Sequence, residues 1–450
     1  MRGAIRARSD GRSRWRALAL LFVCALALRV VFATVLFPAV AGETGLNQGS
    51  DGYEKIARNL LAGEGFRLKE GYARTTLRMP LYPGLLAGIF ATVGDHLWAV
   101  QAAQALLSAG TATVLAALGW TLFGRRAGLL AGWLWAVYPG DLVACSRYLV
   151  EPLTVLLLLL AVVAYRRLKA SSGVGWALVI GLLLGVSVQA KSANALLPLA
   201  FLAAIATTPA FWRPRVRVVG AALGVVAPVA ALAIPWVVRG QQVSGHWFFP
   251  STLGGYGLLE GHFVSTGLED PQNTKSVRKL LYDARAHIAN LAAENDIEID
   301  PKDNFAGTLR RAEDEVKLDR LMKAEFQAHV AADPRGYAWR SLKGLHRFWH
   351  MSPTPTMWNV ALLVHLPLLA LGVVGLLRAG WRRGSDVWLW LLIIGYYNVL
   401  NALIDPLVRY ALAAFPFVML LCGAAFAERS ALGRASETGA EESIAPMKLS

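Results

Sequence analysis

The sequence predicts an all-α polytopic membrane protein with about ten transmembrane helices and two extracytoplasmic loops that carry interfacial helices. Three observations predict this class. Of the 450 residues, 55% are hydrophobic and only 17% are charged, whereas soluble domains carry about 25% charged residues. Apolar runs of about 20 residues, long enough to cross a bilayer, recur along the chain. Basic residues come in short clusters between these runs, as in proteins whose topology is set by positive loops.

The expected segments follow in chain order. They are a basic cytoplasmic tail (1–16), an N-terminal transmembrane module (17–238) that includes a first extracytoplasmic loop (about 38–96), a large extracytoplasmic helical loop (239–356), the C-terminal transmembrane helices (357–427) and a disordered cytoplasmic tail (428–450). The expected spans lie near 17–37, 97–122, 127–143, 149–165, 173–190, 192–208, 218–238, 357–377, 386–403 and 407–427. The first run exceeds a signal-peptide core of about 7–15 residues, and no cleavage site follows it, so we expect it to remain.

The two long loops contain helices of their own. Pro80–Val93 is too short to cross a bilayer comfortably and predicts an interfacial or re-entrant helix. Apolar residues recur at helical spacing over 274–295 and, less regularly, over 304–330. The segment 333–349 is basic and aromatic, which is typical of an interfacial helix before the next span. The six basic clusters fall at alternate ends of the ten expected helices, so both loops are expected outside the cytoplasm.

The net charge of +15 does not indicate nucleic-acid binding, because the basic residues form no single patch or stripe. Cys24, Cys145 and Cys422 show neither the spacing of a metal site nor that of a disulfide framework. We therefore expect the lipid bilayer as a partner, and no nucleic acid. No metal site or cofactor is firmly predicted; a divalent cation would lack a ligand cluster.

The most informative charged residues lie on the extracytoplasmic side of the membrane, where basic residues are normally less frequent. The basic residues at the extracytoplasmic ends of the spans are Arg78, Arg147, Lys191, Arg239 and Arg409, and the carboxylates at the same face are Asp51, Asp141, Glu151 and Asp405. Charges at membrane depth are costly and are usually paired or functional. Such cations suit a polyprenyl-phosphate headgroup, and a carboxylate suits the role of general base for a hydroxyl acceptor. The set predicts glycosyl transfer from a lipid-linked sugar.

Each of these residues also has a structural interpretation. Asp51 follows Ser50 at an expected helix start, where a cap and a favourable helix dipole would explain both residues. Arg147, Glu151 and Asp141 would pair with one another, and Arg239 would anchor its helix at the interface. Arg29, inside the first span, would pair with a carboxylate above it.

Several stretches, in their order and spacing, resemble the bacterial GT-C glycosyltransferases of the protein O-mannosyltransferase and aminoarabinose transferase superfamily. They are GSDGYEKIARNLLAGEGF, the LRMPLYPG segment and the apolar residues after it, RYLVEPLTVLL, IPWVVRGQQVSGHWFFPSTLGGYGLLEGHF and VRYALAAFPFVMLL. The resemblance covers most of residues 15–427 and implies a GT-C-like fold and an inverting transfer at the extracytoplasmic face of the bacterial cytoplasmic membrane.

The resemblance also implies roles for individual positions. Asp51 matches the family's presumed catalytic base, and Arg78 matches the basic residue near the donor phosphate. Lys191 and Arg409 complete the expected phosphate-binding set. We further assign to the substrate pocket the residues Tyr53, Tyr82, Asp141, Arg147, Glu151, Glu260, His262 and Tyr410.

The chain departs from the family pattern at two informative places. The family's Asp-Glu pair is here Asp51-Gly52, which leaves one carboxylate where two would assist a metal. Leu77-Arg78 stands where the aminoarabinose enzymes carry Glu-Lys, so a lipid A aminoarabinose transferase is disfavoured. The alternatives are a flippase or transporter of polyprenyl-linked glycans, an O-antigen polymerase or ligase, and a structural scaffold. A transporter predicts duplicated halves, and the sequence contains no internal repeat.

Overall fold

The computed structural model describes residues 2–39, 51–171, 173–211, 216–270, 272, 276–300, 308–381 and 385–427. This part of the chain is helical, with two isolated β-bridges, Arg67 with Arg74 and Ile299 with Leu309. In order, the elements are α1 (Arg2–Val31), η1 (Phe32–Leu36), α3 (Tyr53–Leu61), α4 (Leu81–Val93), α5 (Leu97–Phe123), α6 (Arg125–Ala136), α7 (Pro139–Cys145), α8 (Glu151–Ser171), α9 (Val174–Ala190), η2 (Ser192–Asn194), α10 (Leu197–Thr207), η3 (Pro209–Phe211), α11 (Val216–Ser244), α12 (Gly254–Gly267), α13 (Val277–Glu294), α14 (Ala312–Ala332), α15 (Pro334–Arg347), α16 (Pro355–Ala379), α17 (Asp386–Leu403), η4 (Val408–Ala413) and α18 (Phe415–Ala424).

A multi-pass membrane protein is confirmed, but the expected count of ten spans is not. Five helices among the described residues are long and apolar enough to cross a membrane, and the bent pair α6 and α7 would make a sixth. The five are Ser13–Ala39, Leu97–Phe123, Arg217–Ser244, Pro355–Ala379 and Asp386–Leu403. The first of them begins inside the segment expected as a basic tail, and α1 itself starts at Arg2. The tail expected at 428–450 lies outside the described residues.

Prolines and helix breaks account for much of the difference in count. The span expected at 127–143 bends by 51° between α6 and α7. Tyr138 has an extended backbone, with φ −68° and ψ 116°, because the ring of Pro139 disfavours the helical conformation in the preceding residue. The span expected at 407–427 is likewise divided into the 3₁₀ segment η4 and the ten-residue helix α18. Apolar composition alone does not reveal such breaks.

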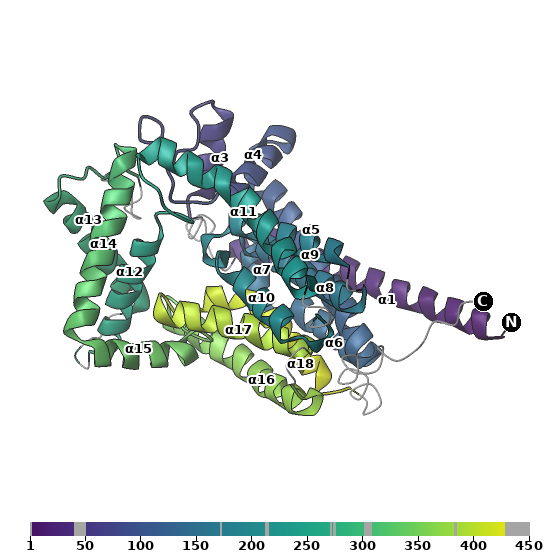
Figure 1. The fold of residues 1–450 in the computed structure, drawn as a ribbon. Coiled ribbons are helices and arrows are strands. Elements are labelled where there is room, and N and C mark those ends of the chain that lie inside the picture. The colour runs from purple at the N-terminus through teal and green to yellow at the C-terminus, as the bar shows by residue number, and fades with distance from the viewer. Residues whose placement is uncertain are drawn as a thin grey trace.

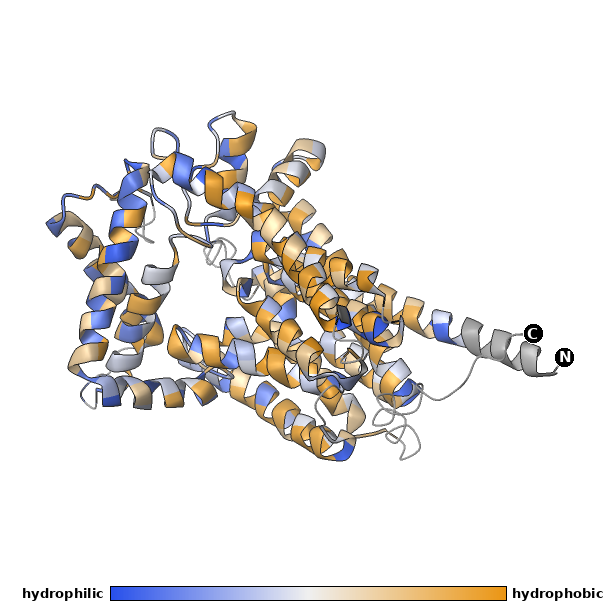
Figure 2. Cartoon of the chain, viewed as in Figure 1, coloured by the Kyte–Doolittle hydropathy of each residue, from blue (hydrophilic) through white to orange (hydrophobic). Residues whose placement is uncertain are grey.

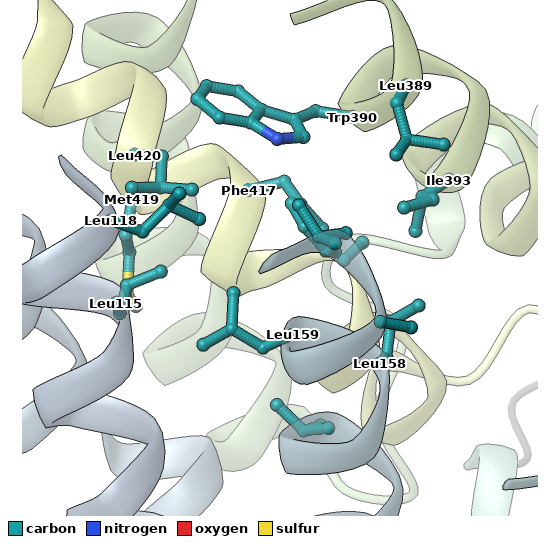
Figure 3. Packing of buried hydrophobic residues seen from close by; sticks show 14 of the residues in the cluster. Leu115, Leu118, Leu158, Leu159, Leu389, Trp390, Ile393, Phe417, Met419 and Leu420 are labelled. Carbon is teal, nitrogen blue, oxygen red and sulfur yellow. The ribbon is translucent and has the colours of Figure 1, made fainter. Parts of the chain in front are cut away.

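The membrane bundle has a continuous apolar core. Leucines of α5 and α8 meet Trp390 of α17 and Phe417 of α18 in its centre (Figure 3). Small residues bring the helices close together: a Cβ on Gly128 of α6 would lie 2.2 Å from the backbone nitrogen of Trp120 in α5. Close backbone approach through small residues is how membrane helices associate. The bundle is thus packed tightly enough to hold polar groups at fixed positions.

One ion pair is fully buried inside this bundle. Arg29 of α1 lies 2.6 Å from the Oδ2 atom of Asp141 in α7, and both side chains are completely buried. Arg29 also donates to the carbonyl oxygens of Ala25, Trp135 and Ala136. The interpretation of Arg29 as a buried structural pair is confirmed, whereas the expected pairing of Asp141 with Arg147 or Glu151 is wrong. A charge this deep needs a partner from another helix, and the sequence does not reveal which one supplies it.

The loop helices form a second lobe beside the bundle. Helices α12, α13, α14 and α15 gather at one end of the molecule, while α1 extends from the opposite end (Figure 1). Apolar residues dominate the bundle, and hydrophilic residues are more frequent on α13 and α14 (Figure 2). The helices expected at 274–295, 304–330 and 333–349 appear as α13, α14 and α15. Helix α12 was not expected.

The first loop is fastened to this lobe. The backbone nitrogen and hydroxyl of Thr76 both donate to Glu315 of α14, each at 2.7 Å. Lys69 contacts Asp300 at 2.6 Å. These contacts bring residues more than 200 positions apart into one assembly.

Candidate active site

A cavity of roughly 380 Å³ lies between the lobe and the bundle, within the range of about 300–1,000 Å³ that is typical of small-molecule sites. Its walls come from the start of α3, the start of α8, the end of α9, the helices α12 and α13, and the segment from the end of α17 into η4. Both membrane helices and loop helices therefore contribute to one site.

Asp51 lies on the wall of this cavity in a constrained turn. It is one of two non-glycine residues with positive φ in the described part of the chain, at 51°, and Gly52 follows at 79°. A Cβ on Gly52 would lie 2.7 Å from Leu68, so the turn requires glycine there. Gly52 is the N-cap of α3, without a side-chain cap, and Ser50 lies outside the described residues. The Asp51 carboxylate instead faces arginine.

Two arginines hold Asp51. Arg409 Nη2 donates to Asp51 Oδ2 at 2.8 Å. Arg78 donates from Nε to the backbone oxygen of Asp51 at 2.9 Å, and its Nη2 lies 3.9 Å from Oδ1. Burial alone would raise the pKa of Asp51, but the charges of Arg409 and Arg78 outweigh burial and leave the pKa below its usual value. The carboxylate is therefore ionised and is held in place by cations from two distant segments.

A second ion pair adjoins the first. Lys191, just past the end of α9, donates to Glu151 Oε1 at 2.9 Å. Its ammonium group also lies 5.1 Å from the ring centre of Tyr410, within cation–π range. Since Tyr410 neighbours Arg409, the two ion pairs form one patch with alternating charges.

The opposite part of the cavity contains a different set of groups. Glu260 of α12 accepts from Arg285 at 2.8 Å and from the Tyr256 hydroxyl at 3.2 Å. Asp405 lies nearby, in the turn before η4, and is 4% exposed. Burial, together with the charge of Glu260, raises the pKa of Asp405 to about 8. At neutral pH this carboxyl group is largely protonated.

Most of the predicted site residues come together in the cavity. Those on its walls are Asp51, Tyr53, Arg78, Glu151, Lys191, Glu260, Arg409 and Tyr410. They come from six separate stretches of sequence. The three predicted phosphate ligands and the predicted base share one patch.

Four predicted pocket residues do not line the cavity. Tyr82 donates to Gln104 at 2.8 Å behind Tyr53. Asp141 is used by Arg29, as described above. Arg147 lies over the ring of Phe37, and His262 stacks on His329 with ring centres 4.9 Å apart. Helix geometry accounts for His262, because residues two positions apart on a helix point in nearly opposite directions and Glu260 occupies the cavity side of α12.

Several lining residues were not assigned from the sequence. They are Tyr256, Arg285, Lys323, Tyr396, Asn401 and Asp405. Arg285 and Lys323 lie on amphipathic loop helices, where a charged residue normally indicates a solvated face. For Asp405 a signal exists: it precedes Arg409 by four residues, and it is among the carboxylates that the sequence predicts at this face.

An apolar groove adjoins the cavity. It lies between α10 and α11, has a volume of roughly 580 Å³, and shares Ala195, Leu196 and Phe249 with the cavity lining. Its remaining walls are aliphatic apart from Trp247. The groove therefore lies directly beside the cavity, and these three residues belong to the walls of both.

No group of three or more His, Cys, Asp or Glu residues in the described ranges is arranged to hold a metal ion. The absence of a metal site remains a prediction.

Comparisons with known proteins indicate which class of protein this chain resembles. Residues 78–238 match the family model described as dolichyl-phosphate-mannose-protein mannosyltransferase. No functionally curated sequence matches the chain. This family match covers much of the N-terminal membrane module, including Arg78, Glu151 and Lys191.

The fold resembles solved glycosyltransferases. The apo oligosaccharyltransferase of Archaeoglobus fulgidus matches with a TM-score of 0.51 at 14% identity, over 91% of this chain and 50% of that one. The AglB oligosaccharyltransferase of the same organism, in complex with an inhibitory peptide and a dolichol-phosphate, matches with a TM-score of 0.51 at 15% identity, over 97% and 53%. ArnT from Cupriavidus metallidurans, bound to undecaprenyl phosphate, has a TM-score of 0.40 at 14% identity, over 93% and 77%.

The chain thus spans about half the length of the archaeal enzymes that it matches. The described helices share the fold of these archaeal membrane enzymes. The family match over 78–238, together with this shared fold, supports the placement of the chain in the GT-C superfamily, as its motifs predict.

Proposed function

We propose that this protein transfers a sugar from a polyprenyl-phosphate-linked donor to a hydroxyl acceptor, with inversion at the anomeric carbon and with Asp51 as general base. The observation that carries the proposal is the position of Asp51 among Arg78, Lys191 and Arg409, on a cavity that joins an apolar groove. The groove suits an isoprenoid chain, and the cations suit its phosphate.

The transfer exchanges one bond for another. The acceptor oxygen attacks the anomeric carbon and forms the new glycosidic bond, while the bond between that carbon and the phosphate oxygen breaks. The acceptor proton passes to Asp51, and the bonding electrons leave with the polyprenyl phosphate. Arg78, Lys191 and Arg409 stabilise the negative charge that grows on the phosphate.

An ionised carboxylate with a low pKa is a weak base. Because Arg409 and Arg78 cause the low pKa of Asp51, a ligand that engages these arginines would raise it. A phosphate that accepts hydrogen bonds from Arg409 and Arg78 competes with Asp51 for both donors. Burial then dominates and raises the pKa of Asp51. Donor binding would thereby make Asp51 a stronger base when the sugar is in place.

The orientation of the protein is part of the proposal. We place the cavity on the extracytoplasmic side of a bacterial cytoplasmic membrane, because the basic clusters alternate as positive cytoplasmic loops do. The donor is a hexose or pentose joined to a polyprenyl phosphate, and the acceptor hydroxyl belongs to a protein, a lipid or a polysaccharide. The oligosaccharyltransferase of similar fold was solved with a dolichol-phosphate, a lipid phosphate of the same kind.

The test is mass spectrometry of envelope glycans and polyprenyl-linked sugars from cells with the wild-type protein, with a deletion, or with Asp51→Asn at matched membrane abundance. We expect Asp51→Asn to reproduce the deletion: one glycan modification disappears and its lipid-linked sugar accumulates. Asp95→Asn is the control, because Asp95 forms an exposed pair with Arg58 away from the cavity. If Asp51→Asn behaves as wild type while the deletion alters the glycans, a flippase or ligase becomes the better account.

A further inference from the structure

One buried acid on the cavity wall forms no ion pair among the described residues. Of the four carboxylates on the walls of the cavity, Asp51 pairs with Arg409, Glu151 with Lys191, and Glu260 with Arg285. Asp405 is the fourth. Within the described ranges its Oδ1 atom has no hydrogen-bond partner, although the residue is 96% buried. A buried polar atom without a partner costs free energy, so this one requires an explanation.

The position of Asp405 is fixed by its backbone. A Cβ on Gly261 of α12 would lie 1.7 Å from the oxygen of Ile404 and 3.2 Å from the Cα of Asp405. Helix α12 therefore packs directly on this turn, next to the end of α17 (Figure 1). The Leu407 nitrogen donates to the Asp405 oxygen at 2.9 Å. With its backbone held on both sides, Asp405 forms part of the cavity wall.

The surroundings of Asp405 favour an uncharged partner. The neighbouring Glu260 adds negative charge, while Arg285 and Arg409 act in the opposite direction. Arg285 and Arg409 are each engaged with another carboxylate. A carboxyl group that keeps its proton both donates and accepts a hydrogen bond, which is the pattern that a sugar hydroxyl matches.

The proposed donor would bring such a hydroxyl to this place. Its phosphate lies against Arg409, four residues beyond Asp405 in the same segment, and its lipid chain leaves through the groove beside Leu196 and Phe249. A sugar joined to that phosphate remains in the cavity. The wall that is left for it carries Asp405, Tyr256 and Asn401.

We infer that Asp405 is a sugar-binding residue, which hydrogen-bonds a hydroxyl of the transferred sugar and so distinguishes the glycosylated donor from the bare lipid phosphate. This inference rests on the proposed function and adds a recognition site to it. Hydrogen bonds of this kind discriminate strongly, because a substrate that lacks the hydroxyl leaves the buried group unpaired.

The experiment measures binding to the purified full-length protein in detergent. The probes are undecaprenyl phosphate and the same lipid phosphate carrying mannose, glucose, galactose or arabinose. We expect wild type to bind at least one glycosylated lipid about tenfold more tightly than undecaprenyl phosphate. Asp405→Leu should abolish this preference without weakening the binding of undecaprenyl phosphate. Asp405→Asn, which can still donate and accept, should retain much of it.

Asp300→Asn is the control, because Asp300 is a buried carboxylate outside the cavity. A preference that survives in Asp405→Leu would overturn the inference, and so would the absence of any preference in wild type. Neither result affects the binding of undecaprenyl phosphate or the requirement for Asp51 in cells. Failure of the proposed function appears in those two measurements instead.

Discussion

At the scale of the residue, the cations near each buried carboxylate decide its chemistry. Asp51 faces Arg409 and Arg78, which hold its pKa below the usual value although burial raises it. Burial raises the pKa of Glu260 against the effect of Arg285. Asp405, to which no arginine of the described ranges is bonded, has a pKa raised to about 8. One cavity therefore holds an ionised acid and a protonated acid at the same pH, as sites with separate acid and base roles do.

The raised pKa of Asp405 predicts a dependence of stability on pH. Because the unfolded chain loses this proton near pH 3.8 and the folded protein keeps it to about pH 8, the free energy of unfolding falls as the pH rises between these values. Asp405→Asn removes this loss. We expect its thermal midpoint to exceed that of wild type by an amount that grows from pH 4 to pH 8 and then levels off.

Thermal unfolding of both proteins in detergent across this pH range provides the measurement. The charged groups that act on Asp405 are Glu260 of α12, Arg285 of α13 and Arg409 of η4, and they are the same in the two proteins. A midpoint difference that is equal at pH 4 and pH 8 would contradict the prediction.

At the scale of the element, helix α12 shapes the site through glycine. Gly255 and Gly261 allow the helix to approach Asp319 of α14 and the turn at Ile404, since a Cβ on either would lie within 2.5 Å of a backbone oxygen. The helix thereby fixes both Glu260 and Asp405 at the cavity wall.

We predict that Gly261→Ala disturbs the site. The added methyl group must push α12 away from Ile404, and such overpacking costs about 1–3 kcal/mol. We expect a lower thermal midpoint and a loss of the preference for the glycosylated lipid. Gly88→Ala in α4 is the matched control, because a Cβ there meets nothing within 4 Å. Equal effects of the two substitutions would show that the close approach of α12 is unimportant.

At the scale of the whole molecule, the cavity joins two parts of different character. The bundle supplies Glu151, Lys191 and Asn401, and the loop lobe supplies Tyr256 and Arg285. A ligand bound there contacts both parts at once. Ligands that bind only the folded state stabilise it by an amount that grows with the logarithm of the ratio of ligand concentration to dissociation constant.

Undecaprenyl phosphate should therefore stabilise the entire protein. At about 100 times its dissociation constant, the expected stabilisation is about 2.7 kcal/mol, seen as an upward shift of the thermal midpoint in detergent. Arg409→Gln should remove most of the shift, because Arg409 belongs to the patch proposed to hold the phosphate. Arg58→Gln, which alters an exposed pair with Asp95, should keep it. An equal shift in both variants would argue against phosphate binding at this patch.

Much of the molecule followed from the sequence. Apolar runs and alternating basic clusters predicted a helical membrane protein, because a bilayer leaves few other solutions for buried backbone groups. Periodicity located the helices α13 and α14, and the charges on the unexpected side, with the family motifs, pointed to Asp51, Arg78, Lys191 and Arg409. These features depend on composition, on the periodicity of apolar residues or on the order of motifs, and all three can be observed in the sequence alone.

Other features were decided only by the tertiary structure. Arg29 pairs with Asp141, and His262 packs on His329 outside the cavity. Arg285 lines the cavity, although its helix has the sequence pattern of a solvent-exposed surface helix. The number of uninterrupted spans also depended on breaks such as the one at Pro139. The physical reason is the same in each case. The partner of an ion pair, the direction of a side chain and the bend of a helix all depend on which distant segments pack together. Sequence periodicity specifies which face of a helix is apolar but not which neighbour covers it.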